Sequence, residues 1–246
     1  MENISYYILS ALAVLVILSI HEFSHGYAAY KLGDNTAKNF GRLTLNPLKH
    51  LDPFGAICMI LFHFGWAKPV PINPRNFKNP KRDFAITALA GPLSNLIMAF
   101  VSAFIYLLSF SLLRDVDFTD KEIWLSVAQN SLDFIFIFHS INVGLAIFNL
   151  IPVPPLDGSR ILNVVLPPKA YFGIMKYERI IYFVLIGWLI LGDYVASFLL
   201  SVPAVASNPI LSALANIFAL SDILSAIFAK ISEAMFSFWQ LLPFLQ

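Results

Sequence analysis

Residues 16–30 read VILSIHEFSHGYAAY, and they place two histidines and a glutamate at the end of a long apolar run. The run spans about 6–29, which matches the roughly 20 residues that one membrane-crossing helix needs. An ionisable side chain in hydrocarbon is costly unless it is paired or ligated. The first element is therefore predicted to be a membrane helix that carries a ligated polar site near its end.

The composition of the whole chain agrees with a membrane protein. Of its 246 residues, 58% are hydrophobic and 13% are charged, against about 45–50% and about 25% in soluble domains. The net charge of +1 lacks the clustered excess of Lys and Arg that a nucleic-acid surface requires, so no nucleic-acid partner is expected. A single cysteine, Cys58, excludes a disulfide within the chain.

The lengths of the apolar runs predict an all-α polytopic membrane protein with about five to six transmembrane helices. A short sixth run, FGAICMILFHFGW at 54–66, fits a re-entrant or interfacial segment better than a full crossing. The final stretch at 231–246 is predicted to lie in the membrane interface. The five runs that qualify as crossings are about 6–29, 84–112, 133–151, 178–200 and 209–229.

Between the first two crossings the helical pattern breaks. GRLTLNP at 41–47 alternates leucines with polar residues, as a strand does. KPVPINPRNFKNP at 68–80 holds four prolines, which exclude an interior strand or helix and leave an edge strand or an extended loop. Residues 35–80 are therefore predicted to form a small layer of sheet and loop at the inner face.

Loop charges predict the orientation, because cytoplasmic loops carry an excess of Lys and Arg. The N-terminus has no Lys or Arg, and the loop at 113–132 is mostly acidic. These charges place the N-terminus outside and the HEFSH end of the first helix on the cytoplasmic side, provided that 54–66 does not cross. The basic loops are 31–50, 67–82 and 152–179.

The pentapeptide HEFSH at 21–25 has the H-E-x-x-H spacing. Residues four apart on a helix share a face, so the imidazoles of His21 and His25 point the same way. Zinc accepts such nitrogens and keeps one position open when it is catalytic, and Glu22 is then placed to act as a base on metal-bound water. A chance pentapeptide on a surface helix is the alternative, which the apolar surroundings disfavour.

A catalytic zinc with two histidines needs a third protein ligand. Asp157 is favoured, because it follows a run of prolines in NLIPVPPLDGSR at 149–160 and shares the inner side with the histidines. Asp133 has the character of a helix N-cap at the outer end of its span. The other candidates in or beside apolar segments are Asp52, Asp83, Asp193, Asp222, His63 and His139.

Three ordered motifs, HEFSH at 21–25, AGPLSN at 90–95 and NLIPVPPLDG at 149–158, resemble those of the site-2 protease family of intramembrane zinc metalloproteases. The resemblance runs from about 15 to 165 and is to the compact bacterial and archaeal branch, without PDZ or CBS domains. It implies one zinc ion held by His21, His25 and Asp157. It also implies that Glu22 is the catalytic base.

The resemblance extends to polar residues in the later spans. It implies that Asn149, eight residues before Asp157, steadies the substrate or the oxyanion. It implies that Asn95 lies beside the site, within reach of a substrate carbonyl. Asn142 shares a helical face with Asn149 and is predicted to bind the substrate, with an interhelical hydrogen bond as the alternative.

These features predict an intramembrane endopeptidase of the cell membrane that cleaves transmembrane helices of membrane-anchored proteins. Residues 1–165 would form the catalytic core, and 166–246 the C-terminal transmembrane helices with an interfacial segment. Two alternatives keep the metal: a hydrolase of a lipid or another amide, and a metal-gated membrane protein without catalysis. An intact Glu22 argues against the second alternative. The sequence does not indicate the oligomeric state.

Overall fold

A computed structural model describes residues 4–52, 55, 67–119, 121–216 and 219–245. Within these residues the secondary structure is helical, and the one pairing of extended backbone is an isolated bridge between Leu51 and Ala67. The predicted all-α polytopic class is confirmed. The short apolar run at 54–66 lies almost entirely outside the described residues.

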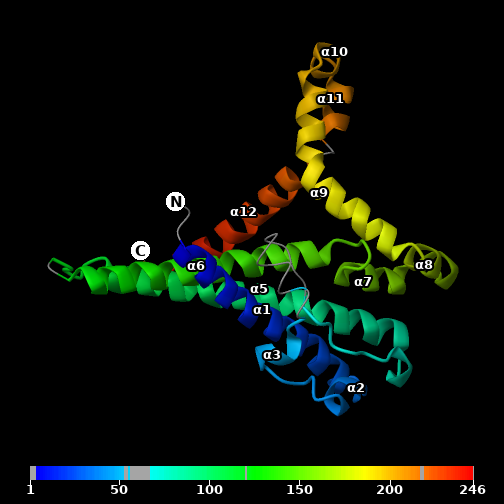
Figure 1. Ribbon diagram of the computed structural model, residues 1–246, viewed down its shortest axis with the longest axis horizontal. Helices are drawn as coiled ribbons and strands as arrows, with labels where there is room; N and C mark the ends of the chain where they lie inside the picture. Colours follow the sequence, from blue (N-terminus) through cyan, green and yellow to red (C-terminus); the bar gives the residue numbers. More distant parts are fainter. Residues whose placement is uncertain (1–3, 53–54, 56–66, 120, 217–218, 246) are drawn as a thin grey trace.

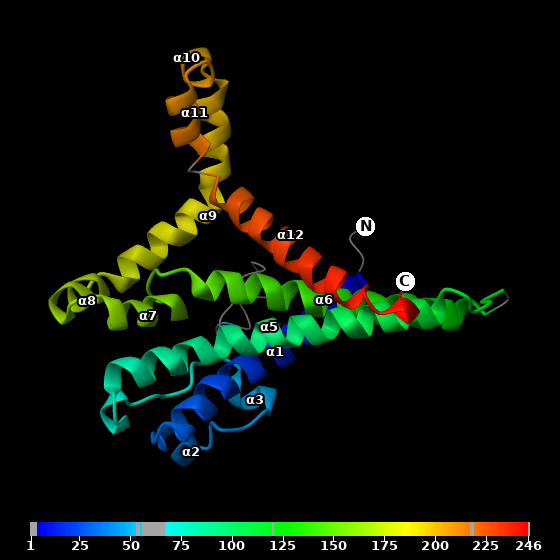
Figure 2. The same cartoon turned by 180° about the vertical axis from the view of Figure 1, so that it is seen from behind.

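Three long helices form the centre of the molecule: α1 (Ile4–Lys31), α5 (Pro80–Leu113) and α6 (Glu122–Leu150). They run side by side in both views (Figures 1 and 2). Together with α9 (Glu178–Ser201), these are the four described helices that are long and apolar enough to cross a membrane. A fifth crossing is possible if α11 (Pro209–Asn216) and α12 (Leu220–Trp239) form one bent span.

Small side chains line the contacts between the central helices. Ala88, Ala99 and Ala103 of α5 are buried, as is Ala146 of α6. Large residues of α5 such as Leu93 point outward instead. This is the pattern of helices in lipid, where small residues allow close approach and large apolar residues face the hydrocarbon. The hydrophobic core cluster adds Ala13 and Ile17 of α1 and Ile137 of α6.

The described residues between α1 and α5 form short helices and extended backbone in place of the predicted sheet. The short helices are α2 (Thr36–Asn39), α3 (Pro47–His50) and the 3₁₀ turn η1 (Pro74–Asn76). The strand predicted at 41–47 is wrong. Gly41 has a left-handed φ of +64°, and the Asn46 side chain accepts from the Leu48 backbone N–H to cap α3, so turn and cap chemistry outweighs the alternating pattern.

The proline-rich stretch after residue 67 is an extended segment that is fixed at both ends. At its start, Lys68 donates its backbone N–H to the His50 carbonyl at 2.8 Å, and Arg42 donates to the Lys68 carbonyl at 2.6 Å. At its end, the Asn73 backbone N–H donates to Asp34 at 2.7 Å. Residues 67–73, called the wall segment below, therefore lie in a fixed position beside α1.

Asp34 ties the wall segment to the end of α1. Its fully buried carboxylate accepts hydrogen bonds from the backbone and hydroxyl of Thr36, from the Asn73 backbone and from the Asn76 amide. Burial alone would raise the pKa of Asp34, but these hydrogen bonds outweigh it and hold the pKa below its ordinary value.

The C-terminal third contains α7 (Asp157–Val165), α8 (Pro168–Met175), α9, α10 (Pro203–Ala206), α11, α12 and η2 (Pro243–Leu245). Figure 1 shows α9 leaving the central helices and α12 returning to them. The crossing predicted at 209–229 falls on α11 and α12, whose axes differ by 75°, so it corresponds to one bent span formed by the two helices. Trp239 donates its indole N–H to the Phe100 carbonyl of α5 at 2.8 Å, so the end of α12 packs on α5.

Candidate metal centre

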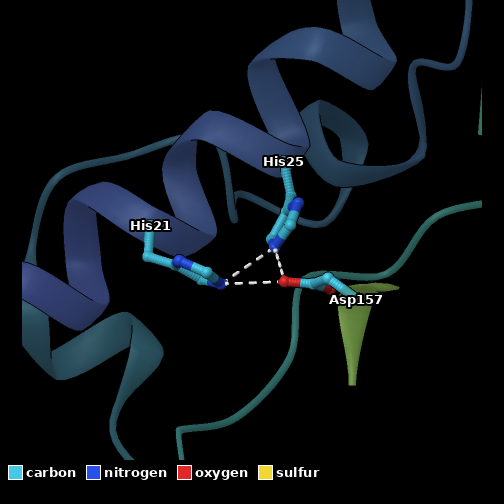
Figure 3. Close-up of side chains that lie close together, drawn as sticks. All are labelled: His21, His25 and Asp157. Atoms are coloured by element: carbon cyan, nitrogen blue, oxygen red, sulfur yellow. Dashed lines mark hydrogen bonds and ion pairs between the residues drawn. The ribbon is translucent and has the colours of Figure 1, made fainter. Parts of the chain in front are cut away.

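Two elements bring three metal-ligating side chains together. His21 and His25 lie one turn apart on α1, and Asp157 is the first residue of α7. The two Nε2 atoms are 3.0 Å apart, and Asp157 Oδ2 lies 3.2 Å from His21 Nε2 and 3.1 Å from His25 Nε2 (Figure 3). All three residues are buried. Among the described residues, this is the one group of three or more such side chains placed to share an ion.

The remaining ring nitrogens of the two histidines have partners outside the cluster. His25 Nδ1 lies 2.8 Å from the Thr87 carbonyl of α5, which can only accept, so Nδ1 carries a proton. In the neutral ring, Nε2 then presents a lone pair. His21 Nδ1 lies 2.5 Å from the Asn95 side-chain oxygen. Ligating histidines in metalloproteins are held in this way by their other nitrogen.

The donor set fits a zinc ion. Two imidazole nitrogens and a carboxylate oxygen are a common zinc ligand set, and bonds of about 2.0–2.1 Å at tetrahedral angles separate ligand atoms by about 3.3 Å. The three observed separations, 3.0–3.2 Å, are close to that value. Asp157 Oδ2 is buried and has no hydrogen-bond partner, as expected for an atom that a cation satisfies.

Two glycines allow the three elements to meet. A Cβ on Gly91 of α5 would lie 2.5 Å from His25 Cε1 and 2.6 Å from His21 Cε1, so only glycine lets α5 pass behind the histidines. A Cβ on Gly158 would lie 2.5 Å from the Ile151 carbonyl oxygen. The turn that delivers Asp157 therefore depends on Gly158 in the same way.

Glu22 lies beside the cluster, and its carboxylate is hydrogen-bonded by a residue outside α1. Its Oε2 accepts the Val70 backbone N–H of the wall segment at 2.7 Å. Glu22, His21 and Asp157 line one cavity of about 590 Å³. The wall segment contributes Ala67 and Pro69, and α9 contributes Tyr182 and Phe183. This volume is called the site cavity below.

The three predicted asparagines have two different settings. Asn149 of α6 lines the site cavity and donates its side-chain amide to the Leu145 carbonyl at 3.1 Å. Asn95 and Asn142 are fully buried behind His21, where their contacts are with His21, each other and the Phe138 carbonyl. The contact between Asn95 and His21 was not indicated by the sequence, because it joins residues that are 74 positions apart.

The sequence of the chain matches a known protein family over most of its length. A family model described as "Peptidase family M50" matches residues 9–192, which is more than half of the chain. The chain belongs to peptidase family M50. The M50 match includes the whole metal centre.

Curated relatives agree with this assignment. YwhC of Bacillus subtilis, named as a candidate zinc metalloprotease, is 41% identical over 203 residues, covering 79% of this chain and 89% of YwhC. Rip2 of Mycolicibacterium smegmatis, similarly named, is 30% identical over 69% of this chain and 61% of its own length. The zinc metalloprotease MJ0392 of Methanocaldococcus jannaschii is 27% identical over 73% of this chain and 40% of its own. No solved structure matches this M50 chain.

The M50 chain is therefore a multi-pass membrane zinc metalloprotease of the site-2 type. The cluster of His21, His25 and Asp157 is the group in it that could hold the metal ion.

Other carboxylates and histidines that the sequence offered as a third ligand have different partners in the M50 peptidase. Asp83 accepts the Asn79 backbone N–H and pairs with Arg82. His139 bonds to the Ala99 carbonyl and to Ser232 of α12. Asp52 accepts from the Gly55 backbone, Asp193 accepts from Ser221, and Asp133 lines a separate cavity with Tyr6. His63 lies outside the described residues.

Proposed function

We propose that this M50 peptidase cleaves a peptide bond of a membrane-anchored substrate within the bilayer, using one zinc ion held by His21, His25 and Asp157. The observation that carries the proposal is the position of these ligands. His21 and Asp157 line a cavity between helices that are long and apolar enough to cross a membrane, and His25 Nε2 lies 3.0 Å from His21 Nε2. Residues 1–165 are the proposed catalytic core, and 166–246 add the helices that close the cavity on one side.

A zinc ion held by His21, His25 and Asp157 would polarise the scissile carbonyl and lower the pKa of a bound water toward neutrality. Glu22 would accept a proton from the attacking water and deliver it to the leaving amine nitrogen. The Val70 N–H occupies Glu22 Oε2, which leaves Oε1 for the proton transfer. Asn149, on the wall of the site cavity, is proposed to donate its amide to the developing oxyanion.

The lining of the site cavity supports an apolar polypeptide substrate. Leu18, Leu145, Phe148 and Phe183 line it together with the polar groups. A transmembrane helix satisfies its backbone groups internally, so part of it has to unwind before a peptide bond reaches the ligands. The extended wall segment lies along the cavity and offers an edge beside which an unwound substrate backbone can lie.

The basic loops support a cytoplasmic position for the metal centre. The histidines lie in the C-terminal half of α1, which ends at Lys31, and the following loop is basic. Since such loops stay in the cytoplasm, we propose that the N-terminus is outside and that cleavage occurs toward the cytoplasmic face.

A direct test compares two substrates on purified protein in lipid bilayers. We expect cleavage of a transmembrane model peptide and no release of fatty acid from the lipid. In Glu22→Gln we expect bound zinc to remain and cleavage to disappear, because the amide cannot accept the water proton. Fatty-acid release without peptide cleavage would instead favour a lipid hydrolase. Peptide cleavage that survives in Glu22→Gln would overturn the mechanism, and bound zinc without any turnover would favour a non-catalytic role.

A further inference from the structure

We propose that Asn142 and Asn95 form a hydrogen-bond relay that fixes the tautomer of His21, so that its Nε2 always faces the metal with a lone pair. This inference rests on the proposed role of His21 as a zinc ligand. It makes the two asparagines positioning residues, which act on the metal through His21 and not by contact with the substrate.

The relay begins at the Phe138 backbone carbonyl, which can act only as a hydrogen-bond acceptor. Asn142 places its amide nitrogen 2.8 Å from the Phe138 carbonyl, one turn earlier on α6. A backbone carbonyl can only accept, so the Asn142 amide has to present its NH₂ group there. Its oxygen then points toward α5.

In the second step, Asn95 connects Asn142 to His21 through hydrogen bonds of its side-chain amide. Asn95 of α5 donates its amide NH₂ to the Asn142 oxygen at 2.8 Å, which leaves the Asn95 oxygen 2.5 Å from His21 Nδ1. An amide oxygen can only accept, so His21 Nδ1 carries the proton. In a neutral imidazole the other nitrogen, Nε2, is then the unprotonated one.

Because the relay is buried, the orientations of its two side-chain amides are fixed. Asn95 and Asn142 are 0% exposed and His21 is 4% exposed. If either amide turned over, two donors or two acceptors would face each other at hydrogen-bond distance. Because water has no access there, the lost hydrogen bonds would not be replaced by bonds to water.

His25 reaches the same state by a shorter route. Its Nδ1 bonds directly to the Thr87 carbonyl of α5. Both histidines are thus directed by a backbone carbonyl, His25 by one on α5 and His21 by one on α6 through two side chains. The packing of α1, α5 and α6 therefore determines which ring nitrogen faces the metal site in both histidines.

The first test measures zinc affinity by competition with a chelator. In Asn95→Leu, which has a similar volume but no acceptor, we expect affinity to fall by about 10–100-fold. Asn142→Leu should weaken it in the same direction, and the double variant should bind as Asn95→Leu does, because Asn142 acts only through Asn95. Wild-type affinity in Asn95→Leu, or losses that add in the double variant, would overturn the relay.

A matched control and a conservative variant separate the relay from packing. Ser102 is also buried on α5 but donates only to the Ala99 carbonyl of its own helix at 2.9 Å, so Ser102→Ala should leave zinc affinity unchanged. Asn95→Asp keeps an acceptor for His21 Nδ1, so it should bind zinc far better than Asn95→Leu. Equal losses in these two Asn95 variants would show that the amide oxygen is not the group that matters.

The second test reads the tautomer without metal or substrate. In zinc-free protein labelled with ¹⁵N-histidine, we expect His21 of the wild type to show a protonated Nδ1, because this nitrogen faces the Asn95 oxygen. Asn142→Leu should leave His21 Nδ1 only partly protonated, whereas Ser102→Ala should leave it as in the wild type. An unchanged His21 spectrum in Asn142→Leu would overturn the relay. Since neither test uses cleavage, failure of the proposed intramembrane protease activity would be seen separately.

Discussion

Val70 donates its backbone N–H to Glu22 Oε2 at 2.7 Å, although the two residues are 48 positions apart. Glu22 is therefore oriented by the wall segment as well as by its own helix. The wall segment in turn is fixed by Arg42 and Asp34 at its two ends. The loop between α1 and α5 thus completes the centre that α1 and α7 begin.

Removing this N–H should slow cleavage without removing zinc. Val70→Pro lies between Pro69 and Pro71, where a proline is compatible with extended backbone. A hydrogen bond to a charged group is worth about 1.5–3 kcal/mol, so we expect the cleavage rate to fall by about 10–100-fold. Cleavage of a transmembrane peptide and bound zinc are the two measurements.

Val70→Ala is the control for that variant, since it removes the buried side chain and keeps the N–H. It should cleave at near the wild-type rate. If the alanine variant is as slow as the proline variant, the side chain is responsible and the proposed orientation of Glu22 is wrong.

Gly91→Ala should disrupt the metal centre directly. The added methyl group would lie 2.5 Å from His25 Cε1 and 2.6 Å from His21 Cε1, so the two rings have to move. Displaced ligands bind zinc less well, and we expect a loss of affinity of at least about 10-fold. Competition with a chelator measures this zinc affinity.

Gly144→Ala on α6 is the control, because a Cβ added there has no atom within 4 Å. It should keep the wild-type zinc affinity. A loss of affinity in this variant too would point to a general effect on folding.

Part of the centre could be predicted from the sequence because its signal is local. The spacing of HEFSH alone places His21 and His25 on one face of a helix, and the proline-rich turn before Asp157 with the loop charges selects one carboxylate among several. Contacts across the bundle leave no such signal. The bonds of His21 to Asn95 and of Glu22 to Val70 depend on how α5 and the wall segment pack, which periodicity does not reveal.

The error in the predicted fold, the strand at 41–47, has a local physical cause. The alternation of Leu43 and Leu45 suggested a strand, but the left-handed Gly41 and the Asn46 cap turn the chain there instead. Hydropathy also predicted a crossing at 209–229. The helices α11 and α12 provide it only as one span bent by 75°, and an average over a window does not detect such a bend.

Asp34→Asn should destabilise the protein in a pH-dependent way. The carboxylate accepts from Thr36, Asn73 and Asn76 in a buried setting, and its pKa is lowered by folding. Such a group contributes stability above its unfolded pKa of about 3.9, and that contribution is lost as the pH falls through the lower folded pKa. We expect a cost of about 1–3 kcal/mol at pH 7.

Thermal unfolding of wild type and Asp34→Asn at pH 7 and at lower pH measures this difference. The gap in Tm should narrow as the pH drops below about 4, because the wild type then loses its charge. Asp117 accepts from Thr119 in the same local pattern but is exposed, so Asp117→Asn should leave Tm nearly unchanged. A constant gap at all pH values would mean that the charge of Asp34 is not the stabilising feature.

Phe183→Ala should weaken substrate binding while sparing the metal. Phe183 lines the site cavity from α9 and is 72% exposed, so its ring is free to pack against an apolar substrate. Loss of such a contact costs about 1–3 kcal/mol, and we expect KM for a transmembrane peptide to rise by about 5–100-fold with bound zinc unchanged.

Phe198→Ala is the control. Phe198 is 70% exposed near the other end of α9 and lies outside the site cavity. An equal effect of Phe198→Ala would assign the change to α9 as a whole, and an unchanged KM in Phe183→Ala would remove α9 from the substrate path.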